Sequence, residues 1–235
     1  MRAHDRAQTS HTMAEARLGV IGAGNMATAL VRGLIAAGSV APTSVWVSSP
    51  SGPRRAIADT GVHCTTDNAV VARNADVLIL AVKPYVLSSA LASVAAALKP
   101  TTLVVSVAAG ISIGQITGML GVGGGWRVIR VMPNTPAAIG QGASAMCLGS
   151  LATEDDAQLA QALFSAIGTV ETVGEAMMDG AAVSRGTRGA RTRVTHSARL
   201  PSLTPLRHSS PPRRSCDGPL WVRPRVCVHV YRGAG

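Results

Sequence analysis

The chain has few aromatic side chains: one Phe, two Tyr and three Trp in 235 residues. Charge is also scarce, because Asp, Glu, Lys and Arg make up 14% of the residues, against 47% that are hydrophobic. Disordered proteins have the opposite composition, so the chain as a whole is not one of them. We therefore expect a folded core built from Val, Ile, Leu, Ala and Met.

Cysteine pairs and long apolar runs are missing as well. The four cysteines, Cys64, Cys147, Cys216 and Cys227, form no CxxC pair and no Cys/His cluster. This excludes a zinc motif, predicts no metal site, and favours a reduced, cytoplasmic setting over a disulfide framework. No apolar run reaches the roughly 18 residues of a membrane-spanning helix. The polar segment 1–16 lacks the apolar centre of a signal peptide.

The net charge of +10 is unevenly distributed. Residues 1–180 hold eleven basic and eleven acidic residues, whereas residues 181–235 hold eleven arginines and one acid. The second stretch is also rich in proline and has no sustained period of 2 or 3.6. We therefore predict a flexible leader over 1–16, with Met13 as an alternative start to Met1, a folded domain over 17–180, and an irregular basic tail over 181–235.

Apolar runs alternate with amphipathic segments along the predicted domain. Strands are expected over 17–22, 45–48, 62–65, 77–81, 103–106 and 128–131, with further strands over 143–148 and 170–173, and helices over 24–37, 53–59, 85–98, 113–120 and 154–167. The continuous apolar run 77–81 is typical of a central parallel strand. The alternation predicts an α/β fold with a Rossmann-type, doubly wound, mostly parallel sheet.

A GxGxxA motif follows the first expected strand and opens the first helix. It consists of Gly22, Ala23, Gly24, Asn25, Met26 and Ala27. Gly22 allows a tight turn, Gly24 leaves room for a pyrophosphate beside the backbone, and Ala27 lets the helix pack close to the strand. The helix N-terminus offers N–H groups and partial positive charge to phosphates. We interpret the motif as a dinucleotide site; the alternative is a glycine-rich turn that binds nothing.

The end of the second strand bears on the choice between NAD and NADP. NAD sites usually carry Asp or Glu there, but here the strand ends in Ser48 and Ser49, with Arg54 and Arg55 soon after. Hydroxyl groups and arginines suit a 2′-phosphate. This pattern favours NADP, unless both arginines belong to an ordinary solvated helix face.

Three later segments lie at the ends of expected strands, where an open α/β sheet places its ligands. They are Ala81, Val82, Lys83 and Pro84; Ser106 to Gly110, which includes Ala108 and Ala109; and Arg130 to Pro136, which includes Met132, Pro133, Asn134 and Thr135. Each alone would be a plain turn, and an isolated lysine such as Lys83 is more often a surface residue than a ligand.

Together these segments resemble pyrroline-5-carboxylate reductase, the NADPH-dependent enzyme of the last step of proline synthesis. The resemblance rests on IGAGNMA (21–27), AVKP (81–84), SVAAGISI (106–113) and RVMPNTPAAIGQG (130–142), in the family's order and at its spacing. The segment VETVGEAMMD (170–179) is similar to the family's link into its second domain. The resemblance extends over about residues 17–184.

The resemblance implies a role for each of these segments. The glycine loop would hold the pyrophosphate of NADPH, Ser48 or Ser49 would contact the 2′-phosphate region, and Asn68 would contact the adenosine. Residues 81–84 would lie along the cofactor, while Ala108, Ala109, Gly110 and the loop Met132–Thr135 would lie near the nicotinamide and the substrate carboxylate. The implied reaction transfers hydride from NADPH to the C=N bond of 1-pyrroline-5-carboxylate, giving L-proline. No catalytic residue is assigned.

From Arg185 onward the chain departs from the family. The segments SGSGPAY and SPGGTT do not occur, so the hydroxyl donor beside the imine and the helical dimerisation domain of this homo-oligomeric family are missing. We interpret 185–235 either as a segment read in a shifted frame of GC-rich coding or as an otherwise aberrant C-terminus, and we expect an inactive chain.

Three other interpretations stay open. The chain could be a non-catalytic NADP-binding relic, or another reductase of the same group, such as a β-hydroxyacid or ketopantoate reductase. A basic tail could also bind nucleic acid through phosphates. The tail's aromatics, Trp221 and Tyr231, are too few for a stacking platform, which argues against nucleic-acid binding.

Overall fold

The computed structural model describes residues 16–52, 54–121, 125–134, 136–137 and 140–178. The predicted tail over 181–235 and all but the last residue of the predicted leader lie outside the described residues. Thr135, a predicted site residue, also lies outside them.

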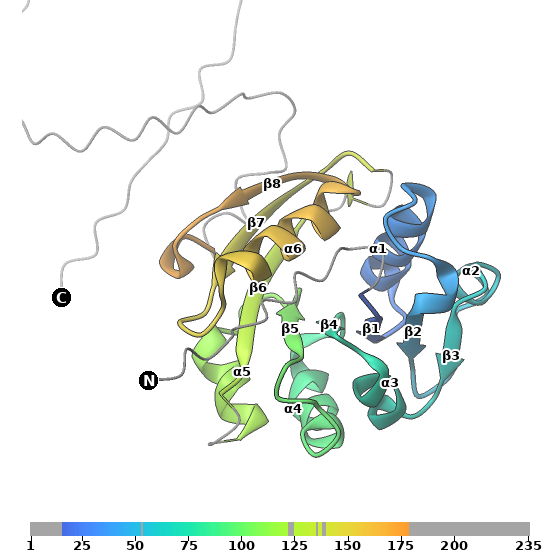
Figure 1. The fold of residues 1–235 in the computed structure, drawn as a ribbon, viewed down its shortest axis with the longest axis horizontal. Helices are drawn as coiled ribbons and strands as arrows, with labels where there is room; N and C mark the ends of the chain where they lie inside the picture. The colour runs from blue at the N-terminus through green and yellow to red at the C-terminus, as the bar shows by residue number, and fades with distance from the viewer. Residues whose placement is uncertain (1–15, 53, 122–124, 135, 138–139, 179–235) are drawn as a thin grey trace, which may run out of the picture. The chain divides into compact units, whose positions relative to one another are not determined.

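Eight strands form one mixed, mostly parallel sheet (Figure 1). They are β1 (Leu18–Ile21), β2 (Val45–Ser48), β3 (His63–Thr65), β4 (Val77–Leu80), β5 (Leu103–Ser106), β6 (Arg127–Pro133), β7 (Gly142–Leu148) and β8 (Gly168–Thr172). The order is β3-β2-β1-β4-β5-β6-β7-β8, and only the β6–β7 pair is antiparallel. The predicted Rossmann-type fold is confirmed, as are all eight expected strands to within a few residues.

Six α-helices connect or cover the described strands. They are α1 (Asn25–Ala36), α2 (Arg55–Ala58), α3 (Asn68–Asn74), α4 (Pro84–Val94), α5 (Ile113–Leu120) and α6 (Glu154–Ser165), with short 3₁₀ turns η1 (Pro42–Ser44) and η3 (Glu175–Met177). The sequence analysis did not predict α3, which is only two turns long. Its start is stabilised by Asp67, whose carboxylate accepts a hydrogen bond from the Ala69 N–H at 2.8 Å. In the described residues, no helix has the length and apolar character needed to cross a membrane.

The strands bury side chains on both faces of the sheet. In β4, Val77 and Ile79 belong to one core cluster, and Leu78 and Leu80 to the other. The first cluster includes residues of α1, α2 and α6, and the second includes residues of α3, α4 and α5. Because both faces are covered, every side chain of β4 is buried, as the continuous apolar run predicts.

The strand order reverses between β1 and β4. The chain moves from β1 outward to β2 and β3, then returns to β4 on the other side of β1 and continues outward through β5 and β6. The connections on the two sides of β1 therefore diverge at the carboxyl ends of β1 and β4. Open α/β sheets bind ligands in the crevice at this point, so the fold places the GxGxxA motif where a ligand is expected.

Candidate functional site

Gly22 joins the ends of three strands. Its φ is +108°, and a Cβ built there would lie 2.6 Å from the carbonyl oxygen of Ala81, directly after β4. Its N–H donates to the carbonyl of Ser48, the last residue of β2, at 2.8 Å. Both the backbone angle and the close approach require glycine here, as predicted for a tight turn.

The N-terminus of α1 is open. Gly24 is its N-cap, no side chain within the described residues caps it, and its first turn has no acidic residue. A Cβ at Gly24 would meet no described atom within 4 Å, so the packing of the protein does not require glycine there. Ala27, by contrast, is fully buried in the core under α1. The free N–H groups and the space beside Gly24 suit an anionic ligand.

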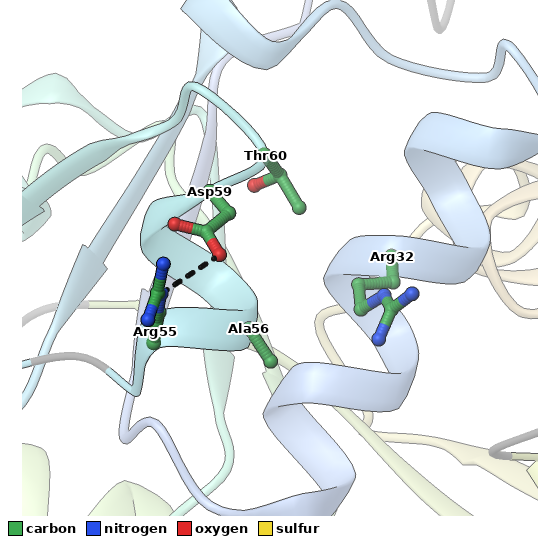
Figure 2. Close-up of a pocket in the computed structure, with 5 residues that line it drawn as sticks. All are labelled: Arg32, Arg55, Ala56, Asp59 and Thr60. Atoms are coloured by element: carbon green, nitrogen blue, oxygen red, sulfur yellow. Dashed lines mark ion pairs between the residues drawn. The ribbon is translucent and has the colours of Figure 1, made fainter.

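The two arginines that follow β2 have different partners in the structure. Arg54 Nη1 donates to the side-chain oxygen of Asn25, in the glycine loop. Arg55, the first residue of α2, instead pairs with Asp59, the residue that follows α2, Nε to Oδ2, at 3.5 Å. This pair and Arg32 of α1 line an open pocket of about 410 Å³, together with Ala56 and Thr60. Figure 2 shows the pair on the α2 side of the pocket and Arg32 on the α1 side. Only Arg54 is brought to the glycine loop.

Ser48 and Asn68, both predicted from the resemblance, contact each other. Ser48 is fully buried, and its hydroxyl donates to the Asn68 side-chain oxygen at 2.6 Å. The Asn68 amide donates in turn to the hydroxyl of Ser93 at 2.9 Å. Ser49 is half-buried and follows the strand. The Ser48 hydroxyl thus orients Asn68, while Ser49 is the hydroxyl closer to solvent.

Lys83 and Pro84 begin α4 at the other side of the strand-order reversal. Lys83 is the N-cap and Pro84 the first helical residue, and within the described residues no side chain caps this helix. The Lys83 ammonium lies 5.8 Å from the ring centroid of Tyr85, whose exposed fraction is 79%. Helices α3, α5 and α6 all carry side-chain caps, so the two uncapped longer helices are those that follow β1 and β4.

Local hydrogen bonds hold the two segments that are predicted to lie near the nicotinamide and the substrate carboxylate. The Ala108 N–H donates to the Ser106 hydroxyl at 3.3 Å, and Gly110 has a φ of +70°. The Asn134 side-chain oxygen accepts from the Ala143 N–H at 2.9 Å, and the Asn134 N–H donates to the Ala143 carbonyl at 3.2 Å. Asn134 therefore closes the connection between β6 and β7, a structural role that the sequence analysis did not foresee.

An ion pair with one buried partner joins β6 to the turn η3. Arg130, in β6, is 2% exposed, and its Nη1 lies 3.3 Å from Glu175 Oε1. The sequence analysis did not single out Glu175, because nothing in its local sequence marks it. The arginine inside the apolar run VIRVMP could have indicated such a pair, since a buried guanidinium needs an acidic partner.

Comparison with protein families and curated sequences relates this arrangement to known reductases. The model of the family described as NADP oxidoreductase coenzyme F420-dependent matches residues 17–110. Pyrroline-5-carboxylate reductase of Methanosarcina acetivorans is 41% identical over 169 residues, which is 71% of this chain and 62% of that protein. The enzyme of Escherichia coli is 36% identical over 166 residues, 70% of this chain and 61% of that protein.

Solved structures show the same relationship. A pyrroline-5-carboxylate reductase from Coxiella burnetii matches with a TM-score of 0.62 and 34% identity, covering 67% of this chain and 58% of that one. Plasmodium falciparum pyrroline carboxylate reductase, solved with NADP bound, matches with a TM-score of 0.64 and 27% identity, covering 70% and 60%. Mycobacterium tuberculosis 3-hydroxyisobutyrate dehydrogenase, at 21% identity, covers 71% of this chain and 57% of that one with a TM-score of 0.56, and shares the fold.

The chain spans about 60% of the length of the curated relatives that it matches. Over about seven-tenths of its own length, this chain resembles the pyrroline-5-carboxylate reductases in both sequence and fold.

Proposed function

We propose that residues 17–180 form an NADPH-binding domain and that the chain derives from a pyrroline-5-carboxylate reductase. The observation that carries the proposal is the open N-terminus of α1. Gly24 carries no side chain at this N-terminus, although a Cβ there would meet no described atom of the protein within 4 Å. A pyrophosphate beside the backbone would explain the glycine.

The residues around this point fit the rest of the cofactor. Arg54 lies against Asn25 of the glycine loop, so its guanidinium is close to both the pyrophosphate position and the end of β2, where a 2′-phosphate would lie. Ser49 offers a hydroxyl on the same side, and Asn68 is oriented by Ser48. Residues 81–84 directly follow β4, on the other side of the strand-order reversal.

In the proposed reaction, bound NADPH supplies the hydride that reduces the C=N bond of 1-pyrroline-5-carboxylate to L-proline. The share of this chain is to bind and orient the two reactants. The loop Ala108–Gly110 and the residues Met132–Asn134 follow β5 and end β6, on the same edge of the sheet as the glycine loop. Substrate would be held there, beside the nicotinamide end of the cofactor. The proposed partners are small molecules, and the proposed setting is cytoplasmic.

The relatives favour this function over a different reductase. Curated pyrroline-5-carboxylate reductases share 36–41% of their residues with the chain over its matched region, whereas the dehydrogenases of other substrates share its fold at 12–21% identity. The second candidate is a non-catalytic NADP-binding relic, which would bind NADPH without reducing 1-pyrroline-5-carboxylate.

Fluorescence titration of the full chain with NADPH and with NADH tests the cofactor. We expect tighter binding of NADPH. Arg54→Gln should weaken NADPH binding about tenfold and NADH binding much less, since the charge-assisted contact that it removes is mainly to the 2′-phosphate, which NADH lacks. Arg55→Gln is the matched control, because Arg55 pairs with Asp59 away from the loop. Equal affinity for both nucleotides, or equal effects of the two substitutions, would contradict the assignment of Arg54.

A further inference from the structure

Arg130 occupies an apolar layer of the core. It lies on β6 between Val128 and Met132, which face the same side of the sheet in the core that α3, α4 and α5 cover. Its neighbour across the β6–β7 pair is Cys147, which is buried in that layer. A guanidinium in such a place is costly unless a carboxylate and hydrogen bonds compensate it.

Glu175 supplies that carboxylate from a distant segment. It begins the 3₁₀ turn η3 after β8, and its side chain is 42% exposed. The Glu175 carboxylate therefore contacts the buried Arg130 while part of its side chain stays in contact with solvent. The buried Met178 anchors the same turn in the core layer around Arg130. The pair is separated by 45 residues in sequence, so tertiary packing alone creates it.

The same carboxylate oxygen also holds the start of α5. Glu175 Oε1 accepts a hydrogen bond from the backbone N–H of Ile113, the first residue of that helix, at 2.7 Å. A carboxylate at a helix N-terminus satisfies a free N–H group and interacts favourably with the helix dipole. The capping box of Ser112 and Gln115 stabilises the first turn independently, so α5 does not need Glu175 in order to form.

Both contacts of Glu175 are close in sequence to the proposed site. Gly110, which ends the loop Ala108–Gly110, lies three residues before the start of α5, and Met132 lies two residues after Arg130. Glu175 therefore links the two segments that flank the nicotinamide end of the proposed cofactor site.

We propose that Glu175 is a positioning residue: its carboxylate, held by the buried Arg130, sets the position of α5 and of the preceding loop at the cofactor site. This inference rests on the proposed NADPH function. It assigns to Glu175 no contact with substrate or cofactor. Its effect passes through the Ile113 N–H and the backbone that leads to Gly110.

The test compares NADPH affinity, thermal stability and amide hydrogen exchange of the full chain and its variants. Glu175→Leu should raise the NADPH dissociation constant about five- to tenfold, speed exchange of the Ile113 amide, and lower the melting temperature, since Arg130 loses its contact with the Glu175 carboxylate. Glu171→Leu is the matched control: Glu171 is an exposed glutamate of β8, and we expect less than a twofold change in affinity.

A double variant separates positioning from stability. Arg130→Met combined with Glu175→Leu removes the buried guanidinium together with the carboxylate that faces it, so the melting temperature should return toward that of the unmodified chain. If Glu175 positions α5, fast Ile113 exchange and weak NADPH binding should persist in the double variant. Recovery of affinity together with stability would overturn the inference, as would unchanged affinity in Glu175→Leu. Failure of the unmodified chain to bind NADPH would overturn the proposed function itself, and this inference with it.

Discussion

Gly22 and Gly24 stand two residues apart and are glycines for different reasons. At Gly22 the protein itself excludes a side chain, because φ is +108° and the Ala81 carbonyl lies in the way. At Gly24 the backbone angles suit any residue, and the space where a Cβ would stand is open. The first glycine is explained by folding, whereas the second fits the proposed pyrophosphate site.

We expect Gly24→Val to weaken NADPH binding by more than about tenfold, about 1.4 kcal/mol, and to leave the fold intact. The branched side chain would occupy the space proposed for the pyrophosphate without touching the described protein. Isothermal titration calorimetry measures the affinity, and circular dichroism the fold. Gly118→Val in α5 is the control, because a Cβ there also meets no described atom within 4 Å. Unchanged NADPH affinity in Gly24→Val would show that the loop is only a turn.

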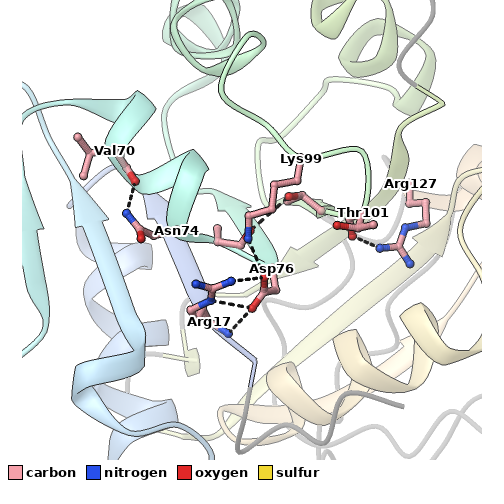
Figure 3. A network of polar contacts seen from close by, with 9 residues as sticks. Arg17, Val70, Asn74, Asp76, Lys99, Thr101 and Arg127 are labelled. Atoms are coloured by element: carbon pink, nitrogen blue, oxygen red, sulfur yellow. Dashed lines mark hydrogen bonds and ion pairs between the residues drawn. The ribbon is translucent and has the colours of Figure 1, made fainter. Parts of the chain in front are cut away.

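At the scale of elements, Asp76 ties three segments together at the amino ends of the strands, opposite the proposed site (Figure 3). It precedes β4, and its carboxylate accepts from the backbone and side chain of Arg17, which precedes β1, at 3.1–3.2 Å. Lys99, before β5, donates to the same carboxylate at 2.8 Å. Burial alone would raise the pKa of Asp76, but the hydrogen bonds from Arg17 and Lys99 outweigh it and hold the pKa well below its ordinary value.

This lowered pKa predicts an acid-dependent stability. An aspartate whose folded-state pKa is depressed stabilises the fold above its unfolded pKa of about 3.9, and loses that contribution as the pH falls below it. We expect Asp76→Asn to reduce the free energy of unfolding by about 2 kcal/mol at pH 7, through weaker bonds to two cations. The difference from the unmodified chain should shrink below about pH 4, as urea denaturation at several pH values would show.

Asp59→Asn provides the comparison for Asp76. Asp59 pairs with Arg55 within α2, but both side chains are mostly exposed, so we expect a change within about 0.5 kcal/mol at any pH. Equal losses of stability in the two variants would mean that the contacts of Asp76 with Arg17 and Lys99 contribute no more than a surface pair.

At the scale of the whole molecule, the chain matches its relatives only over part of their length. The covered portion is about 60% of each curated relative, and residues from Arg185 onward contain no SGSGPAY or SPGGTT segment. The family resemblance places a hydroxyl donor and a dimerising helical domain in that region. Losing one positioned donor costs about 10²–10³ in rate.

We therefore expect the 235-residue polypeptide to reduce 1-pyrroline-5-carboxylate at a negligible rate, because its residues 185–235 supply neither of these family segments. Joining residues 1–184 to an intact C-terminal domain of a related reductase should restore turnover. NADPH oxidation by both proteins at saturating substrate measures the difference. Rapid turnover by the chain as it stands would refute our interpretation of the tail.

The strands, most of the helices and the glycine loop could be predicted from the sequence. These features depend on neighbouring residues: an apolar run such as 77–81 predicts a buried strand, and GxGxxA after a strand predicts the turn into α1. The short helix α3 could not be predicted, because two turns give too little periodicity to recognise.

Contacts between residues that are distant in sequence became known from the three-dimensional fold alone. Ser48 and Asn68, Arg54 and Asn25, and Arg130 and Glu175 are separated by 20, 29 and 45 residues, and no local pattern couples them. The fold also distinguished Arg54, which reaches the glycine loop, from Arg55, which turns to Asp59. The physical reason is that backbone preferences and hydrophobic periodicity act between near neighbours, whereas ion pairs and hydrogen bonds between distant segments form only when packing brings those segments together.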